Sequence, residues 1–506
     1  MEIQSISVAA AAALLAAWAF CLLLAKSIRR RRNLPPGPLP LPVIGSLHLL
    51  GDKPHISISR LSAKYGPVMN LKLGTVNTVV ISSPAAAKEA LQKQDSYFSA
   101  SRGVPDAVRA HDHHHYSVIF LPISPEWRAL RKSLTSNMFS GSKLDANHKL
   151  RDRKIQDLIS YCRKMSRGGE AVDIGREAFK TSLNLLSNTI FSKDLCDPDS
   201  DSAKEFKDLV WSILVETGKP NLADYFPVLG VLDPQGVRRR SSRHLAMVLR
   251  VFKDLIDERA AAQGKILVGG CGDGRHDDDV LDSLLGIGQE GEAPFSSTQI
   301  QHLFADLFIA GTDTSSNTIE WAMSELLRNP ETMAKAQSEL REVLGKGKMI
   351  HETDIPRLPF LQCIVKETFR LHAPSAFLIP RRVEQNLTLF GHTIPKGSQI
   401  LINIWAIGRD PSVWEAPLAF KPERFLGLGM DFRGQDFELL PFGTGRRMCP
   451  GLPMAVRMVH VMLGSLLNSF RWRIEGGVLP NDLDMEEKFG VTLAKAHPLR
   501  AIPIAL

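Results

Sequence analysis

The stretch Phe442-Gly443-Thr444-Gly445-Arg446-Arg447-Met448-Cys449-Pro450-Gly451 decides how this sequence folds and what it holds. Its glycines allow a tight loop whose backbone can lie close to a flat cofactor. An apolar helical pattern follows over residues 455–467, so we expect Cys449 at a helix N-terminus and Pro450 in the first turn. Backbone N–H groups at that place favour a thiolate over a thiol, and Arg447 is positioned to hold a carboxylate of the same cofactor.

A free cysteine also has an ordinary explanation, as a buried structural side chain. The whole stretch, however, resembles the proximal loop of the cytochrome P-450 haem-thiolate enzymes. This resemblance implies haem b (iron protoporphyrin IX) as the cofactor and Cys449 as the axial ligand of its iron. It also implies that Phe442, Gly443, Arg447 and Gly451 contact the haem.

Four further residues resemble the family's contacts to the haem propionates. Trp127 and Arg131 are spaced i,i+4, so they share one face of a helix, and the matching pair in the family binds a propionate. Arg128 and Lys132, with the same spacing, then face outward. Arg102 and Arg381 stand in short contexts that imply two more propionate contacts.

Another part of the resemblance concerns structure rather than chemistry. Glu367 and Arg370 lie at i,i+3 and can pair on a helix, although such pairs alone are common on surfaces. In the family this helix receives a second arginine, which here is Arg424 in Pro422-Glu423-Arg424-Phe425. The resemblance implies a buried network that holds the core on the haem side.

Residues 296–328 predict one long helix, capped at its N-terminus by Ser296 or Ser297. One stripe of this helix follows steps of four, three and four residues, and it comprises Leu303, Leu307, Ala310 and Thr314. Gly311 within it costs about 1 kcal/mol against alanine and needs a reason. The family's reason is a local opening over the haem, where dioxygen binds and where Asp313 and Thr314 help to deliver protons.

Two other patterns predict less than they first suggest. Residues 286–291 satisfy G-x-G-x-x-G, but a helical pattern rather than a strand precedes them, so we interpret them as a loop and not as a dinucleotide site. The histidines at 111 and 113–115 are adjacent rather than at paired-ligand spacing, which argues against a metal site.

The N-terminus predicts a membrane anchor. Residues 3–25 lack charged side chains and, at 1.5 Å per residue, are long enough for the ~30 Å hydrocarbon layer. A cleaved signal peptide is the alternative, but the basic residues follow the apolar run, which favours a single-pass anchor with a cytosolic body. Residues 26–44 form a basic and proline-rich hinge, and residues 45–506 the haem-thiolate catalytic domain.

Composition supports one large globular body that is mainly α with small β-sheets, as in the cytochrome P-450 fold. The sequence is 44% hydrophobic and 23% charged, with six scattered cysteines, which excludes disordered, coiled-coil and disulfide-scaffold classes. Helical patterns cover residues 84–95, 203–217, 243–263, 298–328 and 330–345, and short β-like runs cover 68–73 and 78–81. The net charge of +8 is concentrated before residue 33, and the remainder is too mildly basic for a nucleic-acid surface.

Within the family the sequence looks most like plant microsomal enzymes such as geraniol hydroxylases and terpenoid oxidases. The segments that carry this likeness are 120–122, 221–227, 233–236 and 488–493. The resemblance implies an NADPH- and O2-dependent monooxygenase in the endoplasmic reticulum membrane, supplied with electrons by NADPH-cytochrome P-450 reductase. Arg128, Lys132 and Arg446 would form the cationic docking surface for that partner.

The expected substrate is lipophilic, and a terpenoid is the first candidate. Apolar walls are expected from the helix stripe above together with Phe377 and Val491, and such walls suit a hydrocarbon skeleton. Phenolics or alkaloids stay open as substrates, and so does a non-enzymatic haem sensor or carrier. The intact Asp313-Thr314 pair speaks against a haem-thiolate isomerase or dehydratase.

Overall fold

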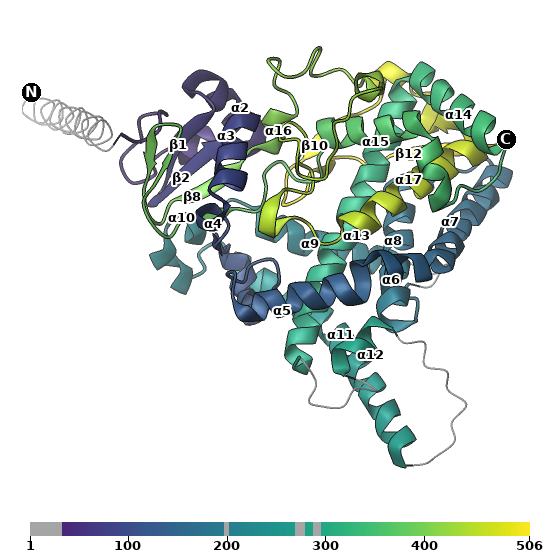
Figure 1. The fold of residues 1–506 in the computed structure, drawn as a ribbon, viewed down its shortest axis with the longest axis horizontal. Coiled ribbons are helices and arrows are strands. Elements are labelled where there is room, and N and C mark those ends of the chain that lie inside the picture. Colours follow the sequence, from purple (N-terminus) through teal and green to yellow (C-terminus); the bar gives the residue numbers. More distant parts are fainter. Residues whose placement is uncertain (1–32, 197–201, 269–278, 287–294) are drawn as a thin grey trace, which may run out of the picture.

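A computed structural model describes residues 33–196, 202–268, 279–286 and 295–506 of the chain. Figure 1 shows a sheet-containing region next to the N-terminal side and a larger body of long helices that extends to the C-terminus. The expected anchor over residues 3–25 lies outside the described residues. Among those that the structure does describe, we find no helix with the length and apolar character needed to cross a membrane.

The main sheet brings together strands from distant parts of the chain. Its five strands run in the order β1 (Val68–Leu73), β2 (Val76–Ile81), β8 (Gln399–Ile402), β5 (Arg381–Arg382) and β3 (Ser101–Arg102). β2 and β8 pair in parallel, with Thr78 opposite Gln399, and the other pairs are antiparallel. The sheet therefore fixes Arg102 and Arg381 side by side.

Smaller elements complete the sheet region. Its helices are α2 (Pro54–Tyr65), α3 (Pro84–Lys88), α4 (Asp95–Phe98), α10 (Leu222–Tyr225) and α16 (Ile404–Ile407). The remaining strands form three small separate sheets. β4 (Val172–Asp173), β12 (Arg500–Ala505) and β9 (Phe470–Ile474) form a three-stranded sheet beside the helical body (Figure 1), β6 (Leu387–Leu389) pairs with β7 (His392–Ile394), and β10 (Glu487–Lys488) pairs with β11 (Ala494–Lys495). A 3-10 segment, η3 (Asp106–His115), leads from the sheet region toward the helical body.

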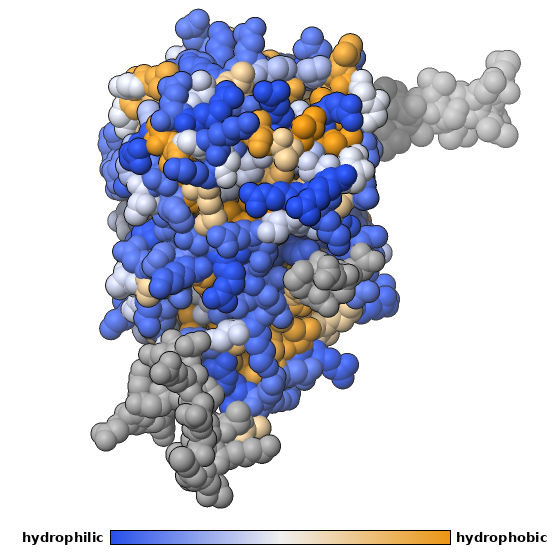
Figure 2. All heavy atoms as spheres, turned by 90° about the vertical axis from the view of Figure 1, so that its right-hand side faces the viewer, coloured by the Kyte–Doolittle hydropathy of each residue, from blue (hydrophilic) through white to orange (hydrophobic). Residues whose placement is uncertain are grey.

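The helical body contains the long elements. They are α5 (Pro125–Leu134), α6 (Gly141–Ala146), α7 (His148–Gly168), α8 (Ile174–Phe191), α9 (Ser202–Gly218), α11 (Val237–Val268), α12 (Val280–Leu285), α13 (Ser297–Arg328), α14 (Pro330–Leu344), α15 (Pro359–Leu371) and α17 (Leu452–Ser469). α13 runs through the middle of the view in Figure 1, and most of its residues are buried. One large apolar core joins these helices, and a second one lies under the sheet. The face in Figure 2 is mostly hydrophilic, with scattered apolar groups, as expected when apolar residues fill a core.

Local signals explain where the two most important helices begin. At α13, the Ser296 hydroxyl accepts from the Gln299 N–H (3.2 Å) and the Gln299 side chain accepts from the Ser296 N–H (2.9 Å), which is a capping box. α17 begins at Leu452 with Gly451 as its N-cap, and Pro453 stands in its first turn. The expectation for Pro450 is wrong, because Pro450 precedes the cap.

Most of the expected elements are present, and the mainly helical fold with small sheets is confirmed. The predicted helical stretches correspond to α3, α9, α11, α13 and α14, and the β-like runs to β1 and β2. The G-x-G-x-x-G pattern begins at Gly286, which ends helix α12 in a left-handed conformation (φ +70°). A helix therefore precedes this pattern, as expected, and the residues after Gly286 lie outside the described ranges.

Candidate active site

A cavity of about 1310 Å³ lies between the sheet region and the helical body. Its walls come from η3, α5, α13, the segment around β5 and the loop before α17. Cys449, Ala310, Thr314 and Arg447 all line it, so the cavity unites sequence motifs that are far apart in the chain. The cavity has two ends, one at Cys449 and one at Asp306.

The loop before α17 holds Cys449 at the cavity wall. The Cys449 N–H donates to the Phe442 carbonyl (3.0 Å) and closes the loop. Gly443 and Gly445 have φ of +68° and +67°, a left-handed conformation that favours glycine. Cys449 keeps accessible surface because it lines the cavity, although protein surrounds it elsewhere.

The thiol of Cys449 is not a free thiolate in the protein alone. Burial raises its pKa, and this effect outweighs the backbone N–H groups of Gly451 and Leu452 and the Arg131 guanidinium, which lower it. The backbone N–H groups at the helix end thus favour the thiolate, as expected, but burial outweighs them. A metal cation at the sulfur would reverse the balance, since coordination deprotonates a thiol.

Four arginines converge on the same part of the cavity, and all of them were expected from the sequence. They are Arg102, Arg131, Arg381 and Arg447. Each donates to the backbone or to Ser99: Arg102 to Ile379 O (2.7 Å), Arg131 to Met448 O (2.8 Å), Arg381 to Ser99 Oγ (2.5 Å) and Arg447 to Ser99 O (3.1 Å). Within the described part of the chain, three buried N–H groups of this set lack a partner, namely Arg102 Nε, Arg381 Nε and Arg447 Nη1.

The charges of these arginines are poorly compensated. Burial lowers the pKa of Arg381 and of Arg447 to about 10, and for Arg447 the guanidiniums of Arg381 and Arg131 lower it further. The pKa of Arg102 falls well below its ordinary value, first through burial and then through Arg381. Buried cations with open donors call for anions. The two propionates of a haem would supply them, and Cys449 stands on the wall of the same cavity to supply the iron ligand.

The aromatic and glycine residues of this end also fit a flat cofactor. Trp127 lines the cavity and lies under the guanidiniums of Arg447 (4.8 Å) and Arg131 (5.6 Å). Its indole N–H donates to Val118 O (3.0 Å) rather than toward the propionate that the resemblance implied. Phe442 lines the cavity and packs edge-on against Phe369 at 5.2 Å between ring centroids. Gly443 and Gly451 line the cavity too, and a Cβ on Gly451 would stand 3.8 Å from Cys449 Sγ.

Helix α13 contributes the hydroxyl that the sequence singled out. Ala310, Gly311 and Thr314 line the cavity, and the Thr314 hydroxyl donates to Ala310 O (2.7 Å). A Cβ at Gly311 would lie 2.9 Å from Leu186 Cδ1 of α8. α8 therefore approaches α13 closely here, although the contact is with the end of a flexible side chain, and α13 is helical throughout.

Asp313 occupies a different face of α13 from Thr314. Its side chain is 2% exposed and accepts from Asn317 Nδ2 (2.9 Å). Burial raises the pKa of Asp313 to about 6. Adjacent helix residues point about 100° apart, so the carboxyl stands behind the cavity wall rather than beside the Thr314 hydroxyl.

Four of the five expected substrate contacts line the cavity, namely Leu307, Ala310, Phe377 and Val491. The Ser375 hydroxyl bonds to the carbonyls of Phe377 (2.7 Å) and Val491 (2.8 Å), which ties the two pocket segments together. Leu303 is instead fully buried in the helical core. On α13 the cavity begins at Asp306, almost one turn later.

Glu367, Arg370 and Arg424 form a buried network beneath the cysteine loop. Arg370 Nε donates to Glu367 Oε2 (2.7 Å) and Arg424 Nε to Glu367 Oε1 (3.0 Å), with Glu367 and Arg370 almost fully buried. Arg370 also donates to the carbonyls of Gly408 (2.5 Å) and Pro417 (2.7 Å). The network thus ties α15 to the segment that leads into the cysteine loop.

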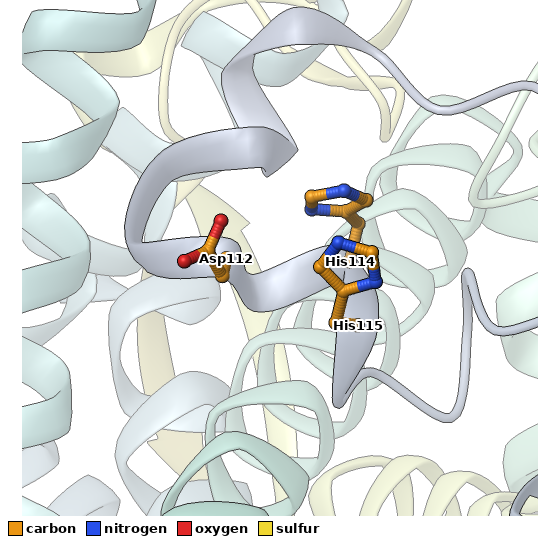
Figure 3. A group of neighbouring side chains, drawn as sticks. All are labelled: Asp112, His114 and His115. Carbon is orange, nitrogen blue, oxygen red and sulfur yellow. The ribbon is translucent and has the colours of Figure 1, made fainter.

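The histidine run holds two groups that the sequence did not separate. His113 is buried and bonds to Asp306 and His302, which the sequence analysis missed. The signal was Asp306 itself, an acid four residues before Ala310 on the apolar face of the long helix. Asp112, His114 and His115 form the other group, shown in Figure 3, with potential ligand atoms within 4.8 Å of one another.

The spacing argument against a metal site was therefore incomplete. His111 and Asp112 have φ of +51° and +54°, and with this turn one ligand atom each of Asp112, His114 and His115 lies within 4.8 Å of the others. Asp112 and His115 are exposed, and exposed acidic groups are common without an ion, so we assign this group no role.

Comparison with known proteins agrees with this geometry. The family described as Cytochrome P-450 matches residues 35–498. The chain is 60% identical to geraniol 8-hydroxylase of Swertia mussotii, over 94% of this chain and 95% of that protein. It is 53% identical to 7-ethoxycoumarin O-deethylase of Helianthus tuberosus (96% and 97% covered) and 52% identical to geranylhydroquinone 3''-hydroxylase of Arnebia euchroma (94% and 95% covered).

Proposed function

Since the chain belongs to the cytochrome P-450 family and is a monooxygenase of that family, we propose that it hydroxylates a terpenoid at an unactivated or allylic carbon. The observation that carries this proposal is the 60% identity to a geraniol 8-hydroxylase over almost the whole chain. The apolar lining by Leu307, Ala310, Phe377 and Val491 supports it, because such walls bind a hydrocarbon skeleton by burying its area. An enzyme of this family is not the non-enzymatic haem sensor or carrier that the sequence left open.

The family implies haem, and we propose haem b, held by the residues of the cysteine end. Cys449 would supply the iron ligand, the four arginines would bind the propionates, and Trp127, Phe442, Gly443 and Gly451 would shape the walls. When bound, a thiolate-ligated haem activates dioxygen so that one oxygen atom enters a C–H bond, with electrons that come from NADPH.

The chain's own residues then control protons and water. We assign to the Thr314 hydroxyl the task of passing protons into the cavity, with Asp313 as the carboxyl behind it. A pKa of about 6 allows Asp313 to take up and release a proton near neutral pH. The apolar walls keep bulk water away from the relay.

The partner and the location follow from the same family. We propose that NADPH-cytochrome P-450 reductase supplies the electrons and docks on Arg128 and Lys132, which are exposed on α5. Arg446, the third expected member of this surface, pairs with Asp95 (2.5 Å) and is largely neutralised. We also propose a membrane anchor over residues 3–25, a hinge over 26–44 and a catalytic domain over 45–506, which would place the enzyme in the endoplasmic reticulum membrane with its body in the cytosol.

Turnover by microsomes that contain this chain and the reductase tests the proposal. We expect at least one mono-, sesqui- or diterpenoid to be converted to an NADPH-dependent hydroxylated product, identified by mass spectrometry. Microsomes with the Cys449→Ser variant serve as the control and should form none. The 7-ethoxycoumarin O-deethylase relative keeps phenolic substrates as the second candidate. Oxidation of phenolics or alkaloids alone would overturn the terpenoid assignment.

A further inference from the structure

A buried polar group borders the cavity on the side of η3. His113 Nε2 lies 3.1 Å from Asp306 Oδ1, and the Ser117 hydroxyl lies 2.9 Å and 2.8 Å from the two Asp306 oxygens. His302 Nδ1 is 2.8 Å from His113 Nδ1. Asp306 is 3% and His113 6% exposed, yet both line the cavity.

The hydrogen bonds in this group support the Asp306 carboxylate. Burial lowers the pKa of His302 to about 4, so His302 is neutral near pH 7. His113 Nε2 faces a carboxylate and must donate to it, and Nδ1 of His113 shares a hydrogen bond with Nδ1 of His302. His302 and Ser117 therefore support the pair from the protein side and fix the carboxylate of Asp306 in place.

The carboxylate retains room for one more donor. Two carboxylate oxygens offer about four acceptor sites, whereas Ser117 and His113 are the donors that the structure supplies to them. The side of Asp306 that lines the cavity is thus an acceptor directed at whatever the cavity holds. Because the neighbouring lining by Leu307, Ile309 and Ala310 is apolar, the Asp306 carboxylate is the polar group that a ligand meets on this wall.

The charge around the cavity favours a neutral donor over a cation. Apart from the four arginines of the cysteine end, the charged lining residues are the cations Arg109, Lys219, Arg238, Arg382 and Lys396 and the acids Asp106, Asp224 and Asp306. Cations outnumber carboxylates, so an ammonium group meets a repulsive field. A hydroxyl meets none, and a hydrogen bond to an ionised acceptor is stronger than one between neutral groups.

The position of Asp306 on α13 sets the distance between a group bound to its carboxylate and the Thr314 end of the cavity. Asp306 and Thr314 are eight residues apart on α13, which at 1.5 Å per residue is roughly 12 Å along the helix axis. This span is close to the length of an extended acyclic monoterpene.

We propose that Asp306, oriented by His113 and Ser117, binds a hydroxyl group that the terpenoid already has and directs oxidation to the opposite end of the molecule. This inference rests on the proposed function and adds to it the residue that selects a terpenoid alcohol, the class to which the geraniol of the 8-hydroxylase relative belongs. Asp306 is then a residue that determines specificity, because it touches the substrate far from the carbon that reacts.

The test compares three ligands of one skeleton: geraniol, the hydrocarbon that lacks its hydroxyl, and the corresponding primary amine. Spectral titration of the holoenzyme gives a dissociation constant for each. We expect geraniol to bind about tenfold or more tighter than the hydrocarbon, and tighter than the amine. In the Asp306→Asn variant, which keeps size and shape, the preference for the alcohol should fall to within about threefold, and its product should spread over several carbons.

The Asp224→Asn variant is the matched control, since it neutralises a different carboxylate that lines the same cavity. It should retain the preference for the alcohol and the single product. Equal affinity of the parent for geraniol and the hydrocarbon would overturn the inference without any variant, as would tighter binding of the amine. An unchanged preference and product in Asp306→Asn would also overturn it. If one of these results is found while the parent still oxidises terpenoids, only this inference fails. If the parent oxidises no terpenoid at all, the proposed function fails as well.

Discussion

The two ends of the cavity are built in opposite ways. At the cysteine end, buried N–H groups of three arginines lack partners in the described chain, and burial lowers the pKa of all three, with Arg381 lowering that of Arg102 and Arg447 further. At the Asp306 end, the same kinds of polar atoms satisfy one another through His113, Ser117 and His302. The cysteine end is therefore incomplete without an anionic cofactor, whereas the Asp306 end is complete and has one acceptor to spare.

This difference separates the residues that hold the cofactor from the residues that select the substrate. The groups that hold the cofactor are fixed by what the cofactor requires, so they leave open donors. The groups that select the substrate are fixed by the protein itself, so they can vary without loss of the cofactor. Changes at one end should therefore leave the other end intact.

Replacement of Cys449 by serine should have the largest effect and should be confined to the cysteine end. The thiolate pushes electron density onto the iron and favours cleavage of the O–O bond, which a serine hydroxyl does not do. We expect complete loss of turnover and of the red-shifted Soret band of the ferrous carbonyl complex. The far-UV circular dichroism should stay that of the parent. An unchanged Soret band in Cys449→Ser would falsify the ligand assignment.

Replacement of Arg370 by methionine should have the next largest effect and should act on stability. Removal of one partner leaves Glu367 charged and almost fully buried, which costs about 3–5 kcal/mol. Thermal unfolding followed by loss of the Soret absorbance measures it. The control is Lys253→Met, which breaks an exposed i,i+4 pair with Asp257 and should leave the transition where it was. Similar midpoints for the two variants would show that the network does not support the cysteine end.

The Thr314→Ala variant should keep both ends of the cavity intact while it interrupts proton transfer. The product formed per NADPH should fall at least tenfold, with the electrons recovered as hydrogen peroxide, while haem content and substrate affinity match the parent. Thr312→Ala is a close control, because the Thr312 hydroxyl bonds to Phe308 O (2.6 Å) and is fully buried on the same helix. If Thr312→Ala and Thr314→Ala are equally uncoupled, the hydroxyl at the cavity has no special role.

The sequence predicts the cysteine end well because that end consists of short contiguous patterns. Cys449 and Arg447 share one loop, and Trp127 and Arg131 share one helical turn, so spacing alone brings each set together. The Asp306 end joins His113 to a residue 193 positions away, and spacing cannot show that contact. A run of histidines looks like one feature in sequence, yet the backbone turn at His111 and Asp112 sends His113 inward and leaves His115 exposed.

The same reasoning explains the smaller errors. The helix stripe correctly places Leu307 and Ala310 on one face, but the sequence does not show where the cavity begins, so Leu303 was included. Gly311 was assigned to an opening of the helix, whereas its neighbour is Leu186 on α8, a contact that exists only in the fold. The pKa of Cys449 was judged from the helix end alone, without the cost of burial.

The last prediction concerns the outer face of α5, where the effect should be smallest. This helix turns Trp127 toward the cavity and Arg128 and Lys132 to the exterior, so it is a thin layer between the cofactor residues and the solvent. The double variant Arg128→Glu, Lys132→Glu should reduce the rate of electron delivery by the reductase several-fold at low salt. The difference should shrink as salt rises, because exposed charges are screened beyond about 8 Å at physiological ionic strength.

Charge reversal elsewhere controls for the change in net charge. Arg250→Glu, Lys253→Glu places the same charges on exposed positions of α11 and should leave the rate and its salt dependence as in the parent. The distribution of products should be the same in all three proteins, because docking affects only how often electrons arrive. A parental rate in the α5 double variant at low salt would place the docking surface elsewhere. A changed product pattern would mean that charges on the outer face of α5 affect substrate binding at the Asp306 end of the cavity.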